Sequence, residues 1–150
     1  MTQAVVAGGL AVAALNAVPA LLGGVRWYRC EPSAAFWLWL RVGQGSALTL
    51  ALAVGSLAAA GNYSSDRLFY LYALLPLAVG FVAEQLRVAS AQTILDQRDL
   101  ADAQAVGALA EDEQRTVVAE IMRRELGVMT LSALVVVFLA LRAAGTAHGF

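Results

Sequence analysis

Apolar residues along this chain gather in four long runs, each separated from the next by a more polar segment. The runs cover residues about 4–25, 36–60, 68–83 and 126–141. Crossing the hydrocarbon of a bilayer as a helix takes about 20 mostly apolar residues. We therefore predict four membrane-spanning helices, and the two short connections make sequence neighbours antiparallel.

The long polar segment, residues 84–125, carries most of the charges and contains no proline. No helix breaker separates it from the third or fourth run, so both helices are expected to continue into water. Three acids, Glu111, Asp112 and Glu113, suit the positive end of a helix dipole, and the two arms are expected to meet near residues 105–107. The predicted fold is all-α, an integral membrane four-helix bundle in one domain over residues 1–150. A cytoplasmic helical hairpin extends spans three and four.

Composition supports a lipid environment, because 60% of the residues are hydrophobic and only 14% are charged. A soluble domain normally carries about 25% charged residues. All ten basic residues are Arg, and with abundant Ala, Gly and Val this is typical of a GC-rich bacterial genome. The predicted location is the cell (inner) membrane. A secretory signal is the alternative for the first run, but no basic residue precedes that run.

The distribution of arginines predicts the orientation, since Lys and Arg accumulate on the cytoplasmic side of a membrane. Two positions, Arg67 and Arg142, lie on the side of the termini. Both termini are therefore expected outside. The arginines of the first and third connections, which are expected in the cytoplasm, are Arg26, Arg29, Arg87, Arg98, Arg115, Arg123 and Arg124.

Small residues recur at spacing four in the first two runs, a pattern that lets helix backbones approach closely in lipid. We expect spans one and two to pack as a tight hairpin through these stripes, or the second stripe to mediate a homo-oligomer through Gly43, Ala47, Ala51 and Gly55. An Ala-rich chain also produces such stripes by chance. The first stripe is Gly9, Ala13 and Ala17, and the second continues to Ala59.

Four polar residues are placed at membrane depth near the inner end of the spans, namely Asn16, Arg41, Gln44 and Glu84. Helical rise puts Arg41 about 7–8 Å below the inner end of its span. Two interpretations are open. The cluster is a binding or translocation site in which Arg41 pairs with Glu84, or it is structural, with Arg41 reaching lipid headgroups and Glu84 pairing with Arg87.

The polar segment also holds Asp96, Asp99 and Asp102, whose spacing of three predicts a common helix face, with Arg98 paired to Asp102. This acidic face is our candidate for docking a cytoplasmic protein partner. A divalent cation is the other ligand that such carboxylates suit, but the spacing matches no dedicated calcium loop. A solvated face is the preferred interpretation, and no metal site is predicted.

The sequence lacks the residues that several functional classes require. A net charge of −1 argues against nucleic-acid binding, and the single Cys30 excludes a cysteine-rich metal site within the chain. His148 is the one histidine and lies in a tail that we expect to be mobile, far from any nucleophile. We therefore predict a protein without enzymatic activity and without a cofactor, in contact with membrane lipid.

The sequence favours a scaffold or accessory subunit that recruits a partner through its cytoplasmic hairpin. The alternative is a small oligomeric transporter or channel that uses the polar cluster in the inner half of the bundle. Four helices barely enclose a pore, so this alternative requires assembly with further copies.

Overall fold

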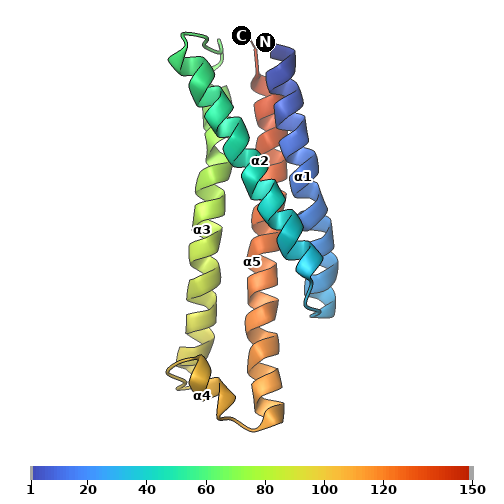
Figure 1. Ribbon diagram of the computed structural model, residues 1–150, viewed down its shortest axis with the longest axis vertical. Coiled ribbons are helices and arrows are strands. Elements are labelled where there is room, and N and C mark those ends of the chain that lie inside the picture. The colour runs from blue at the N-terminus through green and yellow to red at the C-terminus, as the bar shows by residue number, and fades with distance from the viewer. Residues whose placement is uncertain (1, 149–150) are drawn as a thin grey trace.

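Figure 1 shows the computed structural model, which describes residues 2–148. Four of its helices are long and apolar enough to cross a membrane, and the described part of the chain contains no strand. The prediction of an all-α chain with four candidate spans is confirmed. The helices are α1 (Thr2–Arg29), α2 (Ala34–Ala59), α3 (Arg67–Gln97), α4 (Ala103–Gly107) and α5 (Glu111–Thr146).

Polar caps set where the middle helices begin. The Ser33 hydroxyl accepts a hydrogen bond from the Phe36 amide at the start of α2, and the Asp66 carboxylate accepts one from the Leu68 amide at the start of α3. Such caps satisfy amide groups that have no partner within the helix. Gly61 turns the chain after α2 with a φ of 83°, a conformation that glycine adopts without strain.

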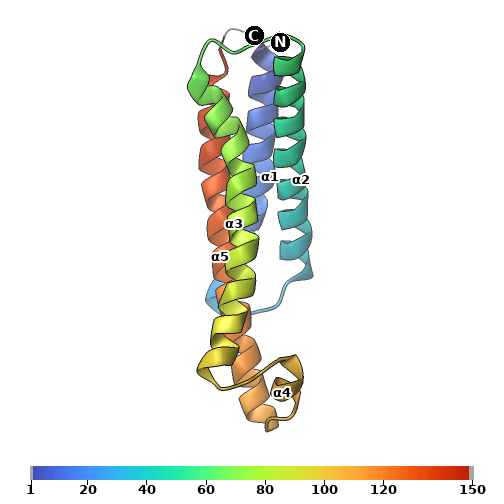
Figure 2. The same cartoon turned by 90° about the vertical axis from the view of Figure 1, so that its left-hand side faces the viewer.

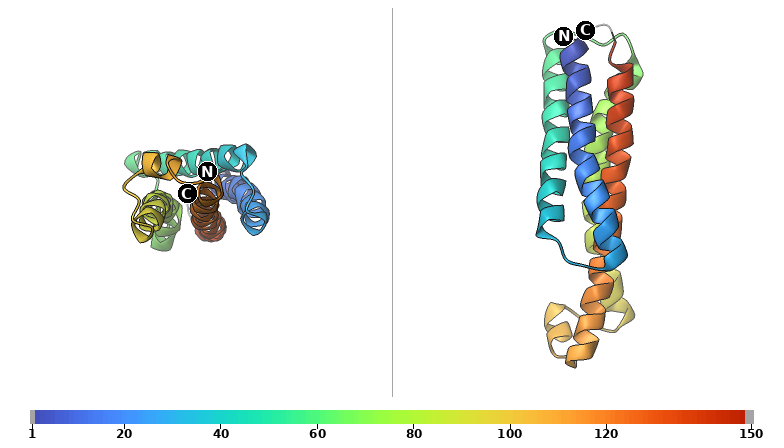
Figure 3. Two further views of the ribbon diagram at one scale, coloured as in Figure 1. Left: turned by 90° about the horizontal axis from the view of Figure 1, so that it is seen from below. Right: turned by 90° about the vertical axis from the view of Figure 1, so that its right-hand side faces the viewer.

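The helix α5 lies between α1 and α3 and has the most extensive contacts, while α2 crosses this row obliquely (Figure 1). Seen from below, α3, α5 and α1 stand side by side and α2 lies over them (Figure 3). The central place of α5 explains why half of its apolar window is buried, more than in any other candidate span.

Small residues of α1 approach α5 as well as α2. A side-chain carbon built on Gly9 would lie 3.1 Å from the Cβ of Ala144 and 3.2 Å from the carbonyl oxygen of Ala140. Ala13 lies in a buried cluster that Ala47 of α2 and Ala140 of α5 both join. The first stripe therefore contacts α5 as well as α2, because α5 presents small residues of its own.

The stripe on α2 is buried over only part of its length. Gly43, Ala47 and Ala51 are buried within the chain, whereas Gly55 and Ala59 are exposed. Towards the C-terminal end of α2 the buried position belongs instead to Val54, which is 2% exposed. Most residues of the stripe therefore already pack against other parts of the same chain.

Beyond the ends of α1 and α2, the helices α3 and α5 continue side by side and are joined through α4 (Figure 2). We call residues 88–120 the extension. Ile94 and Val117 form its core, at 1% and 0% exposure, and the Arg98 guanidinium lies 3.0 Å from the Glu120 carboxylate. Helix α5 begins at Glu111, as the acidic run predicts. The short helix α4 covers residues 105–107, where the two arms were expected to meet.

At the opposite end, Ala147 and His148 are packed against the connection between α2 and α3. The His148 carbonyl accepts hydrogen bonds from the Ser64 hydroxyl at 2.8 Å and the Ser65 amide at 3.1 Å. Ala147 is fully buried. The expectation of a mobile tail at His148 is therefore wrong, because polar groups of the connection bind its backbone.

Candidate functional site

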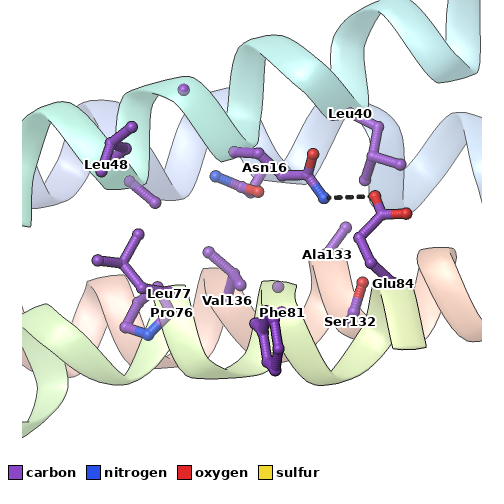
Figure 4. Close-up of a pocket in the computed structure, with 14 residues that line it drawn as sticks. Asn16, Leu40, Leu48, Pro76, Leu77, Phe81, Glu84, Ser132, Ala133 and Val136 are labelled. Atoms are coloured by element: carbon purple, nitrogen blue, oxygen red, sulfur yellow. Dashed lines mark hydrogen bonds between the residues drawn. The ribbon is translucent and has the colours of Figure 1, made fainter. Parts of the chain in front are cut away.

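Three of the four predicted polar residues meet between α2 and α3. Arg41 Nη1 donates to Glu84 Oε1 at 2.5 Å and to Gln44 Oε1 at 2.7 Å. Gln44 Nε2 also donates to Glu84 Oε1, at 3.3 Å (Figure 4). Arg41 and Gln44 are one turn apart on α2, so a single carboxylate on α3 reaches both.

The other oxygen of Glu84 continues the network towards α5. It accepts a hydrogen bond from Arg87 Nε at 3.1 Å, and Arg87 Nη1 lies 3.8 Å from the Glu125 carboxylate. The Arg87 guanidinium also lies over the ring of Trp37, 5.4 Å from its centre. Glu84 thus has both of the partners that the sequence suggested as alternatives. The charges alternate in sign across three helices, and each side chain has an oppositely charged neighbour.

Asn16 lies beside this network without joining it. Its amide group donates to the carbonyl oxygens of Val12 at 2.9 Å and of Gly43 at 3.2 Å. The side chain is 2% exposed and links α1 to α2. A side-chain carbon on Gly43 would lie 2.7 Å from Asn16 Oδ1, so this cross-link requires glycine at position 43.

A groove of about 330 Å³ runs between α2 and α3 and ends at the polar network (Figure 4). Asn16, Gln44 and Glu84 are its main polar residues, the Ser132 hydroxyl donates back to the Met129 carbonyl of its own helix, and the remaining lining is apolar. Gly45 and Gly80 line the groove with no atom near the place of a side chain, which keeps it wide. The groove suits an apolar group with one polar end. Its other lining residues include Leu40, Leu48, Pro76, Leu77, Phe81, Ser132, Ala133 and Val136.

Two close contacts that the sequence pattern did not predict hold α1 at this end. The Trp27 ring covers Gly127 of α5, where a side-chain carbon would lie 2.9 Å from the ring. Gly23 faces Thr130, whose buried hydroxyl oxygen has no hydrogen-bond partner among the described residues. A side-chain carbon on Gly23 would overlap this oxygen and lie 2.5 Å from the ring of Phe36. The adjacent glycines at 23 and 24 were the available sequence signal, since one of them had to face a neighbour.

The acidic residues of the extension do not share a helix face, and this prediction is wrong. Asp96 lies in the last turn of α3, whereas Asp99 follows the helix with a φ of 54°, and Asp102 caps α4 by accepting from the Ala105 amide. Arg98 pairs with Glu120 and not with Asp102. The reason is that α3 ends at Gln97, so helical spacing stops applying there.

Within residues 2–148 no group of three His, Cys, Asp or Glu side chains is arranged to hold a metal ion. Cys30 lies at the end of α1, where its thiol donates to the Trp27 carbonyl at 3.7 Å. The candidate site among the described residues is therefore the network around Glu84 together with the groove that ends at it.

Comparisons of the chain with models of protein families, with curated proteins and with solved structures each find no match.

Proposed function

We propose that this protein is a non-enzymatic integral membrane protein that acts as a scaffold or accessory subunit and recruits a partner through the extension. The observation that carries the proposal is the packing of the extension itself. Ile94 and Val117 give it a buried core beyond the ends of α1 and α2, and the pair of Arg98 and Glu120 joins its two arms. A projection with its own core presents a defined surface to a soluble partner.

The proposed location is the inner membrane of a bacterial cell, with both termini outside and the extension in the cytoplasm. The arrangement of the helices supports opposite positions for the extension and the termini (Figure 1). Arginines concentrate at the end that bears the extension, which is the cytoplasmic pattern. The four-helix bundle is then the membrane domain, and the extension is its cytoplasmic hairpin.

We propose that the partner binds near α4 through basic side chains of its own. Asp96 and Asp99 are exposed, and so is Asp102, the residue that caps α4. None of the three forms an ion pair within residues 2–148. Three unpaired carboxylates around one short helix attract a positively charged surface and raise its rate of association.

Site-specific photo-crosslinking in living cells tests this proposal. A photoreactive residue at the exposed position of Gln104 or Asp112 is expected to form one discrete protein adduct, and the same residue at Tyr63 is the control at the other end of the molecule. Changing Asp96, Asp99 and Asp102 to Asn together should abolish the adduct, because Asn keeps the α4 cap and removes the charge. Equal adducts from the extension and from Tyr63, or an adduct unaffected by the triple change, would contradict the proposal.

The second candidate is a small oligomeric transporter or channel, which the polar groove between α2 and α3 favours. Gln44 and Glu84 open onto that groove, and Asn16 lines it. Assembly through the α2 stripe would have to begin at Gly55, since Gly43, Ala47 and Ala51 are already buried.

Proteoliposomes with a pH dye and a potassium gradient test this candidate. A proton or potassium flux that exceeds the flux of empty vesicles and is lost in Glu84→Gln supports this candidate. The absence of any such flux contradicts it for these two ions.

A further inference from the structure

A second groove lies at the base of the extension, at the level where α1 ends. Its volume is about 490 Å³, and the Trp27 indole forms one edge. Arg123 and Arg124 line it one turn before Gly127, the residue that Trp27 covers. A tryptophan beside arginines is typical of a membrane interface. Its other lining residues are Ser90, Glu120, Gly127, Val128 and Leu131.

The groove has an excess of positive charge. Neither Arg123 nor Arg124 forms a hydrogen bond or an ion pair with any residue between 2 and 148, and both are exposed. Glu120 is the one acid in the lining, and its carboxylate is already paired with Arg98 at 3.0 Å. The neighbouring Glu125 lies 3.8 Å from Arg87. Two guanidinium groups therefore remain free to bind an anion, and their planar donors match a phosphate.

The basic groove continues directly into an apolar one. Val128 and Leu131 line both this groove and another of about 520 Å³ that only α3 and α5 form. Helical rise gives about 16 Å between Arg124 and Val135, the last residue of α5 in the apolar groove. This length is about half of a 30 Å hydrocarbon core, or the depth of one leaflet. The rest of its lining is Leu75, Ala78, Val79, Val82, Ala83, Leu86, Ser132 and Val135.

We propose that the two grooves together form a binding site for an anionic phospholipid of the leaflet at this end of the molecule. The phosphate binds between Arg123 and Arg124, and one acyl chain lies in the groove between α3 and α5. A basic pocket that opens between membrane helices recognises acidic headgroups in this way. The apolar continuation distinguishes a lipid from a soluble phosphate, because only the lipid fills both grooves. The bound lipid fixes the extension at its base, beneath the surface proposed for the partner.

Quenching of Trp27 fluorescence by brominated lipids tests the site in the full-length protein. Trp37→Phe and Trp39→Phe leave Trp27 as the reporter, since the chain has three tryptophans. The protein is reconstituted in phosphatidylcholine vesicles that contain either brominated phosphatidylglycerol or brominated phosphatidylcholine. The site predicts a preference for phosphatidylglycerol of about thirtyfold, the size expected for two arginines near a membrane surface.

Two variants separate the two halves of the site. Arg123→Gln with Arg124→Gln should remove the preference, whereas Arg115→Gln, an exposed arginine farther along α5 that pairs with Glu111, should keep it. Ala78→Phe should fill the apolar groove and also weaken the preference. Circular dichroism checks that each variant remains helical.

Three results would overturn the proposal. The first is equal quenching by the two lipids in the parent protein. The second is an unchanged preference in the double arginine variant. The third is a preference that millimolar inorganic phosphate abolishes while Ala78→Phe leaves it unchanged, because the ligand would then be a soluble phosphate.

Discussion

The guanidinium of Arg41 on α2 lies 2.5 Å from the carboxylate of Glu84 on α3 and bridges the inner end of the groove between these helices. Contacts between α2 and α3 are fewer than those of α5 with α1 or α3. The ion pair is therefore a main direct link between α2 and α3. Otherwise these two helices are held together chiefly by the helices that contact both of them.

Replacing Glu84 by Gln should destabilise the protein more than replacing Arg41 by Gln. Glu84 accepts hydrogen bonds from Arg41, Gln44 and Arg87, whereas Arg41 loses only its own two bonds. We expect a loss of about 1–3 kcal/mol in the free energy of unfolding for Glu84→Gln, the range for hydrogen bonds to charged groups. Arg41→Gln should lose less, because its side chain is 53% exposed. Denaturant unfolding in detergent micelles measures both values.

Exchanging the two charges provides the control. Arg41→Glu together with Glu84→Arg restores the pair but places a new arginine beside Arg87, so the double variant should recover only part of the loss. Additive effects of the two single changes would show that the side chains do not interact.

Gly23→Ala and Gly24→Ala should have opposite effects on stability. A methyl group at position 23 overlaps the Thr130 hydroxyl and meets the Phe36 ring, which must cost about 1–3 kcal/mol or more. A methyl group at position 24 meets no atom within 4 Å and should stabilise the helix by about 0.5–1 kcal/mol. Melting temperatures of the two variants in one detergent test the contrast. A loss of the same size at both positions would contradict the packing of α1 against α5.

The spans were predictable because a bilayer imposes both length and apolarity on a helix, and the continuous α3 and α5 followed from the absence of breakers. The partners of Glu84 could also be predicted, since helical rise places Arg41 and Glu84 at the same depth. The partner of Gly9 was not predictable, because small residues occur on α2 and on α5 alike. Nor was the position of Asp102, since the end of α3 at Gln97 has no proline or glycine to mark it.

Ile94→Ala should loosen the extension while leaving the spans intact. The side chain is 1% exposed, and removing a buried isoleucine costs about 2–5 kcal/mol. Hydrogen exchange should become faster in residues 88–120 and stay unchanged in α1. Val118→Ala is the matched control within the extension, because the Val118 side chain is 55% exposed. Unchanged exchange in the extension of Ile94→Ala would show that this core does not hold it together.

Asn16→Leu should weaken the contact between α1 and α2. The change removes the hydrogen bond to the Gly43 carbonyl, worth about 1 kcal/mol between membrane helices, while the number of heavy atoms in the side chain is kept. Thermal unfolding in micelles measures the loss, and Ser56→Ala is the control, since its hydroxyl bonds only within α2. An Asn16→Leu protein as stable as the parent would show that the link contributes nothing.

Cysteine labelling in intact cells tests most directly whether the extension lies in the cytoplasm with both termini outside. Cys30→Ser removes the single native cysteine, and one new cysteine is placed at Tyr63 or at Ala108. The account predicts that a membrane-impermeant maleimide labels Tyr63→Cys in intact cells, and Ala108→Cys only after permeabilisation. Labelling of both positions in intact cells, or the reverse pattern, would contradict it.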